Sequence, residues 1–243
     1  MKVDAIIFDK DGTLIDFDAF WVGVSVAALE DILAGLGRRD IPIEEILKAY
    51  GVYEGVTDID GVLCKGTYAQ MAEIFSQILA RHGCSVSTEA AEALIVDAYN
   101  RSTDKGKILP TCPDLASTLE SLKKSGVRLA VVTTDNPEIT ERCLCTLGIS
   151  DLFDRIYTDD GKTPKKPDPA AAIGFMELVG VPPERTLMVG DTMTDVTFAR
   201  RAGISVCAVA SSIKAREALL PHADAVISKI SELAELTEGR EEC

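Results

Sequence analysis

Short runs of β-branched and other apolar residues recur along this chain of 243 residues. Runs this short, apolar without alternation, are typical of strands buried on both faces of a parallel sheet. A weaker candidate of the same kind covers Arg155–Tyr157. The stronger candidates are Ala5–Phe8, Val127–Val132, Thr186–Val189, Ile204–Val209 and Ala225–Ile227.

Helical patterns occupy the intervals between these runs. Several end at a glycine, such as Gly126 or Gly203, which suits the C-terminus of a helix. The helical intervals are Pro113–Lys124, Pro137–Leu147, Pro169–Val179, Thr192–Arg201, Ile213–Leu220 and Ser228–Leu236. Regular strand–helix alternation predicts an α/β fold with a doubly wound parallel sheet that helices cover on both faces.

One long segment after the first strand breaks this alternation. Between Asp16 and Lys107 we find no convincing strand, and Gly55–Thr67 is expected to be a loop. Helical patterns cover Ala19–Leu36, Ile43–Ala49, Thr67–His82 and Thr88–Arg101. The chain is therefore expected to hold two domains: an α/β core of residues 1–15 and 108–243, and a helical insert of residues 16–107.

Polar clusters follow four of the predicted strands. They are Asp9 to Thr13 (DKDGT), Thr133 to Asn136 (TTDN), Lys165 to Pro169 (KKPDP) and Gly190 to Asp195 (GDTMTD). Ligands of open α/β sheets bind beyond the carboxyl ends of the strands. The four clusters are therefore expected to converge on one edge of one sheet.

Four aspartates dominate these clusters. Asp9 and Asp11 are two apart and can face the same group, Gly12 permits a sharp turn, and Asp191 and Asp195 share a helix face. Carboxylates gathered in a cleft repel one another unless a cation joins them, and Mg²⁺ suits such oxygen ligands. Taken singly, these residues also fit solvated turns and a helix N-cap.

The composition narrows the range of partners. With 39 Asp+Glu against 25 Lys+Arg, the formal net charge is −14, which repels nucleic acid and anionic membranes. An anionic substrate would then need a local positive site. No stretch is long and apolar enough to span a bilayer and no signal pattern begins the chain, so a cytoplasmic protein is expected. The seven cysteines include no CxxC pair, which favours reduced thiols.

The four motifs, in this order and each after a predicted strand, resemble those of the haloacid dehalogenase superfamily of hydrolases. The resemblance covers most of the chain outside the insert. It is strongest to the phosphoglycolate phosphatase-like branch, which carries a helical cap between its first and second motifs. The resemblance implies a Rossmann-like core, Mg²⁺ as the cofactor and a small phosphorylated metabolite as the substrate.

The resemblance also implies roles for single residues. Asp9 would attack phosphorus, and Asp11 would protonate the leaving oxygen and then deprotonate the attacking water. Thr133 would hydrogen-bond the phosphoryl group, and Lys166 would neutralise charge on the nucleophile and the phosphate. Because an alkyl halide needs no proton on departure, the aspartate at position 11 favours phosphoryl chemistry over dehalogenation.

The remaining assignments concern the metal and the phosphate. The resemblance implies Mg²⁺ ligands from Asp9, the main-chain carbonyl of Asp11, and Asp191, with Asp195 helping directly or through water. Phosphate binding would involve Gly12, Thr133, Thr134 and Lys166. A plain alternative for Thr134 and Asn136 is that they cap the next helix.

Two regions depart from the family pattern or leave it open. Lys10 stands where an apolar residue is often found, and we expect it to point away from the nucleophile and to reach the insert. Within the insert, Lys65 and Thr67 are candidates for substrate specificity, with a plain surface loop as the alternative. His82 and His222 are isolated and are expected to be structural.

Two other functions compete with a phosphatase. A phosphomutase resembling β-phosphoglucomutase would tend to carry a histidine soon after the first motif, and Asp16–Trp21 contains none. A non-catalytic binding or regulatory protein on the same scaffold could dispense with Asp9 or Asp11, and both are present. The sequence specifies neither the natural substrate nor the oligomeric state.

Overall fold

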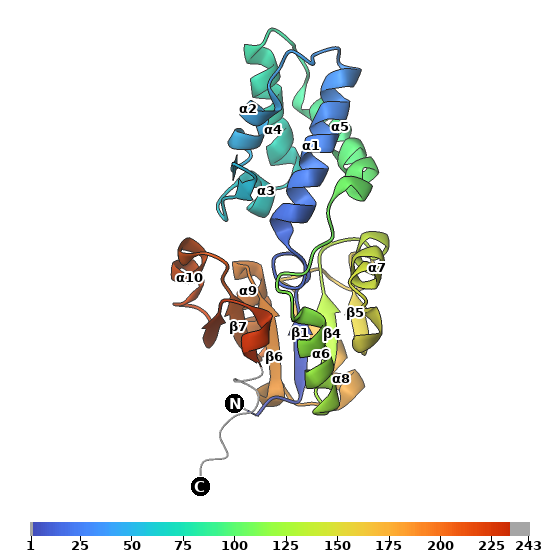
Figure 1. Ribbon diagram of the computed structural model, residues 1–243, viewed down its shortest axis with the longest axis vertical. Helices are drawn as coiled ribbons and strands as arrows, with labels where there is room; N and C mark the ends of the chain where they lie inside the picture. Colours follow the sequence, from blue (N-terminus) through green and yellow to red (C-terminus); the bar gives the residue numbers. More distant parts are fainter. Residues whose placement is uncertain (1, 234–243) are drawn as a thin grey trace. The chain divides into compact units, whose positions relative to one another are not determined.

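The computed structural model describes residues 2–233 of the chain and contains a six-stranded parallel sheet (Figure 1). The strands lie in the order β5-β4-β1-β6-β7-β8. Their bounds are β1 (Ala5–Phe8), β4 (Arg128–Val132), β5 (Arg155–Tyr157), β6 (Thr186–Gly190), β7 (Ser205–Val209) and β8 (Ala225–Ile227). The predicted doubly wound sheet is confirmed, and the weak candidate at Arg155–Tyr157 is a strand.

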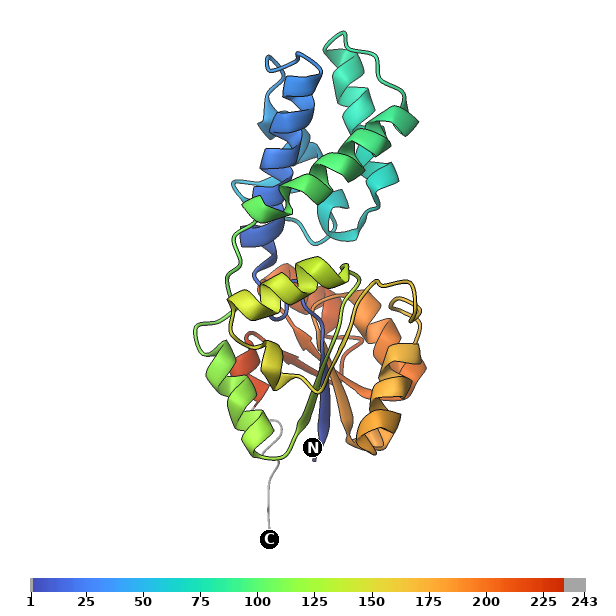
Figure 2. The same ribbon diagram turned by 90° about the vertical axis from the view of Figure 1, so that its right-hand side faces the viewer.

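Helices cover both faces of this sheet. Figure 2 shows the sheet nearly edge-on, with α6 against one face and α8 against the other. The helices are α6 (Leu115–Lys124), α7 (Pro137–Thr146), α8 (Ala170–Val179), α9 (Met193–Ala202) and α10 (Ile213–Leu219). With water excluded from both faces, β1 and β6 are buried along their whole length, which explains their lack of alternation.

The direction in which strands are added reverses at the centre of the sheet. β1 pairs with both β4 and β6, so Phe8 lies opposite Val131 on one side and Val189 on the other. From β1 the chain adds β4 and β5 in one direction, then crosses back to β6. Ligand sites of such folds lie at this reversal, beyond the carboxyl ends of the strands. Residues that follow β1, β4 and β6 are therefore the candidates for a ligand site.

Residues 17–107 form a second compact unit, separate from the α/β unit of residues 1–16 and 108–243. Its helices are α1 (Gly23–Gly35), α2 (Ile43–Ala49), α3 (Val62–Lys65), α4 (Tyr68–Arg81) and α5 (Thr88–Ser102), with a π-helical turn at Asp18–Val22 and a 3-10 turn at Thr103–Lys105. We call this the helical unit. Buried faces of α1, α4 and α5 supply its core.

The helical unit is not entirely helical, which corrects the expectation that this segment has no strand. β2 (Val52–Tyr53) and β3 (Val56–Thr57) form an antiparallel hairpin. Glu54 and Gly55 both have positive φ, as a tight two-residue hairpin turn requires. Strands of two residues are too short to show any alternation. The first expected helix is also altered, because a π-helical turn precedes α1.

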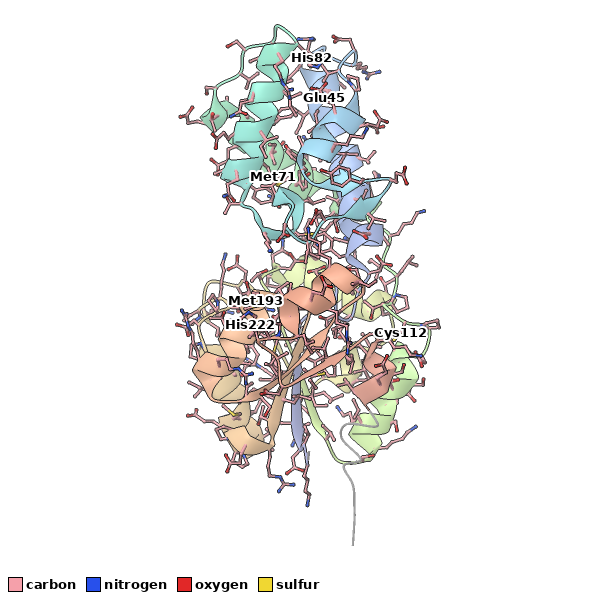
Figure 3. The ribbon with its side chains drawn as sticks, turned by 90° about the vertical axis from the view of Figure 1, so that its left-hand side faces the viewer. Glu45, Met71, His82, Cys112, Met193 and His222 are labelled. Carbon is pink, nitrogen blue, oxygen red and sulfur yellow. The ribbon has the colours of Figure 1, made fainter. Side chains whose placement is uncertain are left out.

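Polar contacts fix the ends of elements in the helical unit. The Asp18 carboxylate accepts hydrogen bonds from the Thr57 amide at 3.0 Å and its hydroxyl at 2.5 Å. His82 and Glu45 lie side by side in Figure 3, with 2.8 Å between Nε2 and the carboxylate. Thr67 caps α4, since its hydroxyl accepts from the Gln70 amide. His82 thus has the structural role expected of it.

Three remaining expectations concern the whole chain. Of the helix expected at Ser228–Leu236, the described residues contain a 3-10 turn at Ile230–Glu232, and residues 234–236 lie outside the described part. Among residues 2–233, no helix has the length and apolar character needed to cross a membrane. The cysteines of this part are free thiols.

Candidate active site

The site is built around Asp9, the first residue after β1. Its amide donates to the carbonyl of Val189 in β6 at 2.8 Å, which continues the strand pairing by one residue. The side chain therefore leaves a rigid strand end rather than a mobile loop. Only 8% of Asp9 is exposed, so its carboxylate is largely shielded from water.

Lys166 joins two of the aspartates. Its Nζ lies 2.5 Å from Oδ1 of Asp9 and 2.7 Å from Oδ1 of Asp195. The neighbouring Lys165 points outward, pairing with Asp159 at 2.6 Å. The KKPDP loop thus brings one of its two lysines into the sheet edge, and it is the one that sequence reasoning selected.

Asp191 follows β6 and approaches the first motif directly. Its Oδ1 accepts a hydrogen bond from the buried Thr13 hydroxyl at 2.8 Å. Gly12 has φ +77°, and a Cβ at this position would collide with the Asp191 carboxylate. Gly12 therefore allows the turn and makes room for Asp191. Thr13 was not among the predicted site residues, although it completes the DKDGT motif that pointed to its neighbours.

Asp195 lies in the first turn of α9, whose first residue, Met193, is labelled in Figure 3. Thr192 caps this helix and exchanges hydrogen bonds with Asp195 in a capping box. A Cβ on Gly190 would collide with the Asp195 side chain, so the end of β6 also requires glycine. Asp195 is wholly buried, with one oxygen facing Lys166 and the other bound by Thr192.

Burial and mutual repulsion set the charge of this cluster. Burial raises the pKa of Asp9 to about 7, with Lys166 opposing the shift and Asp195 adding to it. Burial, followed by repulsion from Asp9 and Asp195, raises the pKa of Asp191 well above its usual value. Burial alone would lower the pKa of Lys166, but its two carboxylate partners outweigh burial and raise it. The lysine thus stays charged, while the carboxylates are short of positive charge.

A divalent cation fits this donor set. Asp9, Asp191 and Asp195 each offer a carboxylate oxygen, and these oxygens lie within 4.8 Å of one another. Hard oxygen donors at such spacing suit cations of the Mg²⁺ and Ca²⁺ type. A bound cation would also remove the repulsion that raises the carboxylate pKa values. The cluster is therefore a candidate metal centre.

The second motif brings Thr133 to the same edge of the sheet. Thr133 is buried directly after β4, and its amide donates to the Tyr157 carbonyl at 3.0 Å. Its hydroxyl accepts from the Asp135 amide at 3.2 Å. Thr134 is exposed, and Asn136 caps α7 by accepting from the Ile139 amide. The capping alternative thus holds for Asn136, while the phosphate-binding role of Thr134 remains a prediction.

Lys10 is buried between two carboxylates of the α/β unit, and its expected reach to the insert remains a prediction. Its side chain is wholly buried in the α/β unit, with Nζ 2.7 Å from Oδ1 of Asp11 and 2.9 Å from Oδ2 of Asp135. Burial alone would lower the pKa of Lys10, but Asp11 and Asp135 outweigh burial and raise it. Charged residues are usually exposed. Asp11, together with Asp135 from the end of the neighbouring strand, accounts for this burial.

Comparison with known proteins agrees with this geometry. Residues 3–203 match the family model of haloacid dehalogenase-like hydrolases. The chain is 30% identical to phosphoglycolate phosphatase 1 of Pseudomonas aeruginosa over 205 residues, 84% of this chain and 68% of that protein. It is 29% identical to pyrophosphatase PpaX of Bacillus velezensis over 240 residues, 97% of each protein.

A solved structure shows the same fold. The crystal structure of a haloacid dehalogenase-superfamily hydrolase of subfamily IA from Geobacter sulfurreducens aligns with a TM-score of 0.69 at 20% identity, over 97% of this chain and 96% of that one. The match to the family model confirms the expected superfamily and the expected hydrolase enzyme. Both sequence relatives above carry the names of phosphatases. This chain belongs to the haloacid dehalogenase-like hydrolases.

Proposed function

We propose that this hydrolase is a Mg²⁺-dependent phosphatase that cleaves a small phosphate monoester through an aspartyl-phosphate on Asp9. One observation carries the proposal: Lys166 contacts Asp9 and Asp195 at 2.5 and 2.7 Å, and Asp191 lies in the same acidic cluster. A nucleophilic carboxylate beside both a fixed ammonium and a metal site suits attack on an anionic phosphoryl group.

The chemistry divides into two halves. In the first, an Asp9 oxygen bonds to phosphorus, the bond to the leaving oxygen breaks, and Asp11 gives that oxygen its proton. In the second, Asp11 takes a proton from water, the water oxygen bonds to phosphorus, and the Asp9 carboxylate is released. Lys166 balances the charge of Asp9 and of the phosphoryl oxygens throughout, and its contact with Asp195 keeps it in place.

Thr133 and Gly12 complete the proposed phosphate site. The buried Thr133 hydroxyl, at the end of β4, would donate to a phosphoryl oxygen. The Gly12 turn keeps the backbone after Asp11 compact, and Thr13 orients Asp191 at 2.8 Å.

Magnesium is the proposed metal. Asp9 and Asp191 would hold it together with the main-chain carbonyl of Asp11. Asp195, whose oxygens already accept from Lys166 and Thr192, would assist through water. When bound, Mg²⁺ would supply positive charge that offsets the charge of the carboxylates and of the phosphate. This explains how a chain of net charge −14 could bind an anion.

The relatives suggest which substrates to test first. Phosphoglycolate is the substrate class named for the Pseudomonas aeruginosa relative, and pyrophosphate is that named for the Bacillus velezensis relative. A carboxylated monoester and an inorganic anhydride differ in size and charge, so their rates will differ in a selective enzyme. The use of the helical unit as a substrate-selecting cap remains a prediction from its place in the chain.

A substrate screen tests the proposal. Purified protein would be assayed for phosphate release with Mg²⁺ from p-nitrophenyl phosphate, phosphoglycolate, pyrophosphate and a panel of sugar phosphates. We expect Mg²⁺-dependent release, abolished by chelation, with at least one monoester preferred by its specificity constant. Asp9→Asn serves as the matched inactive control. Equal release by that variant, or no release from any monoester, would refute the proposal.

A further inference from the structure

A second buried lysine lies next to the nucleophile. The Lys10 side chain has no exposed surface, and it pairs with Asp11 at 2.7 Å and with Asp135 at 2.9 Å. The nucleophile is its immediate neighbour in sequence, and Asp11 is the proposed acid and base. The ammonium of Lys10 thus contacts the one site residue that must both give and take a proton.

The far partner of Lys10 is itself fixed. Asp135 lies two residues beyond Thr133, and its amide donates to the Thr133 hydroxyl at 3.2 Å. Its carbonyl accepts from the Asp159 amide at 2.7 Å, which ties this loop to the segment after β5. Because β4 pairs directly with β1, Asp135 is presented to Lys10 by an adjacent strand. Lys10 is therefore held between two strand ends.

Stability alone does not account for this arrangement. Burying an ammonium costs several kcal/mol before its partners repay it, and an apolar side chain of similar size is often as stable or more so. Lys10 also occupies a position between two site aspartates, where its placement fixes the side chain that follows. The cost of burying the Lys10 ammonium is explained if the ammonium orients the Asp11 carboxylate.

We propose that Lys10, anchored by Asp135, is a positioning residue that holds the Asp11 carboxylate in the orientation required for proton transfer. The inference rests on the proposed function, because it assigns Lys10 a role only through Asp11. Lys10 touches neither the substrate nor the metal in this scheme. Its effect falls on the steps in which Asp11 moves a proton.

A positioning role and a general role in the stability of the fold predict different effects on the two halves of the reaction. With p-nitrophenyl phosphate, Asp9 bonds to phosphorus and the electron pair of the broken bond leaves on p-nitrophenolate, which needs no proton. Hydrolysis of the aspartyl-phosphate still requires Asp11 to accept a proton from water. Misplacing Asp11 therefore slows the second half and spares the first.

The test is pre-steady-state kinetics of Lys10→Met with p-nitrophenyl phosphate and Mg²⁺. We expect a burst of about one p-nitrophenolate per enzyme at near the wild-type rate, followed by a steady state reduced about 10- to 100-fold. Asp11→Asn should show the same pattern with a larger reduction. The double variant should be no slower than Asp11→Asn alone, because both changes act on one function.

Several outcomes would overturn the inference. Lys10 has no positioning role if Lys10→Met slows the burst and the steady state equally or leaves both unchanged. The same conclusion follows if the double variant shows the full loss of Lys10→Met added to that of Asp11→Asn. If Lys10→Met does not fold, Asp135→Asn takes its place, because it keeps the ammonium and weakens its anchor; it also removes the Asp135 charge beside Asp11. That variant should show the same pattern with a smaller reduction, and an unchanged steady state would again refute the role. A fully active Asp11→Asn would instead refute the proposed function itself.

Discussion

The aspartates at the two ends of the central sheet differ in their ion pairing and in the direction of their pKa shifts. At the amino end, Asp154 accepts from the Leu129 amide at 2.9 Å and pairs with Arg128 at 3.0 Å. Asp224 makes equivalent contacts in the other half of the sheet, with Arg200 at 2.8 Å. Burial would raise the pKa of Asp154, but Arg128 and the amide outweigh it and lower the pKa; Arg200 does the same for Asp224. Each carboxylate there has its own cation.

At the carboxyl end, Asp9, Asp191 and Asp195 gather around Lys166. Burial and crowding raise the pKa values of Asp9 and Asp191. Paired carboxylates stabilise a fold, whereas a crowded set is unfavourable without a further cation. The aspartates at the amino end are thus paired in a way that favours stability, whereas those at the carboxyl end form a candidate cation site. Each prediction below compares a change at one end with a control.

The largest expected effect is on turnover at the carboxyl end. Asp9→Asn removes the proposed nucleophile while keeping the shape of the side chain, so kcat should fall by about 10⁴-fold or more. Steady-state hydrolysis of p-nitrophenyl phosphate measures this loss. Asp154→Asn, the same chemical change at the amino end, should leave kcat unchanged. Comparable losses in both variants would contradict the division between the two ends.

A neighbouring pair of lysines offers the next contrast. Lys166→Met leaves Asp9 and Asp195 buried without their cation, so kcat should fall about 10²- to 10³-fold and unfolding should need less denaturant. Lys165→Met, one residue away, removes only a surface pair with Asp159 and should change both quantities little. Denaturant titrations and initial rates give the two readouts. Equal effects of the two substitutions would count against the site.

Magnesium should stabilise the protein by binding to the aspartates at the carboxyl end of the sheet. If the acidic cluster binds Mg²⁺, a concentration of 100 times Kd raises the free energy of unfolding by about 2.7 kcal/mol. Thermal unfolding with and without Mg²⁺ measures this gain. Asp191→Asn should lose most of the gain, while Asp224→Asn should keep it in full. A gain that survives Asp191→Asn would place the metal elsewhere.

The smallest expected effect is on the pH dependence of the free energy of unfolding, which should have opposite signs for Asp154 and Asp9. The folded-state pKa of Asp154 is lowered, so its contribution is present above about 3.8 and is lost as pH falls through the folded pKa. The pKa of Asp9 is raised from 3.8 to about 7, so in metal-free protein its penalty grows between those values as pH rises.

Two variants separate these opposite slopes. Asp154→Asn should cost about 1 kcal/mol at neutral pH, and the cost should shrink below pH 4. Asp9→Asn, without metal, should flatten the decline in stability between about pH 4 and pH 7. Denaturant titrations across this range give both curves. Identical pH profiles for the two variants would remove the contrast.

The sequence predicts most of the α/β unit because its signals are strong and local. Ala5–Phe8 and Ala225–Ile227 are strands with the expected bounds, and both are apolar throughout, although only the first is fully buried. The helical ends beside glycines such as Gly180 and Gly203 also lie within a residue or two of expectation. The hairpin at Val52–Thr57 escapes prediction because two-residue strands carry no pattern.

The candidate site shows where such reasoning stops. Spacing and motif order pointed to Asp9, Asp191 and Lys166, which the structure brings together. The burial of Lys10 was not predicted, because a lysine is ordinarily exposed and Asp11, its neighbour in sequence, supplies only one of two carboxylate partners. Its partner, Asp135, is 125 positions away in sequence and reaches it only through the pairing of β1 with β4. A charge pair between residues so distant in sequence becomes visible only in the three-dimensional structure.

Trapping the intermediate tests the central claim most directly. The protein would be quenched in acid during turnover of p-nitrophenyl phosphate with Mg²⁺, digested, and mapped by mass spectrometry. The account predicts one added phosphoryl group on the peptide that contains Asp9, and none in Asp9→Asn. A phosphoryl group found on another residue, or turnover with no labelled protein even in Asp11→Asn, would contradict it.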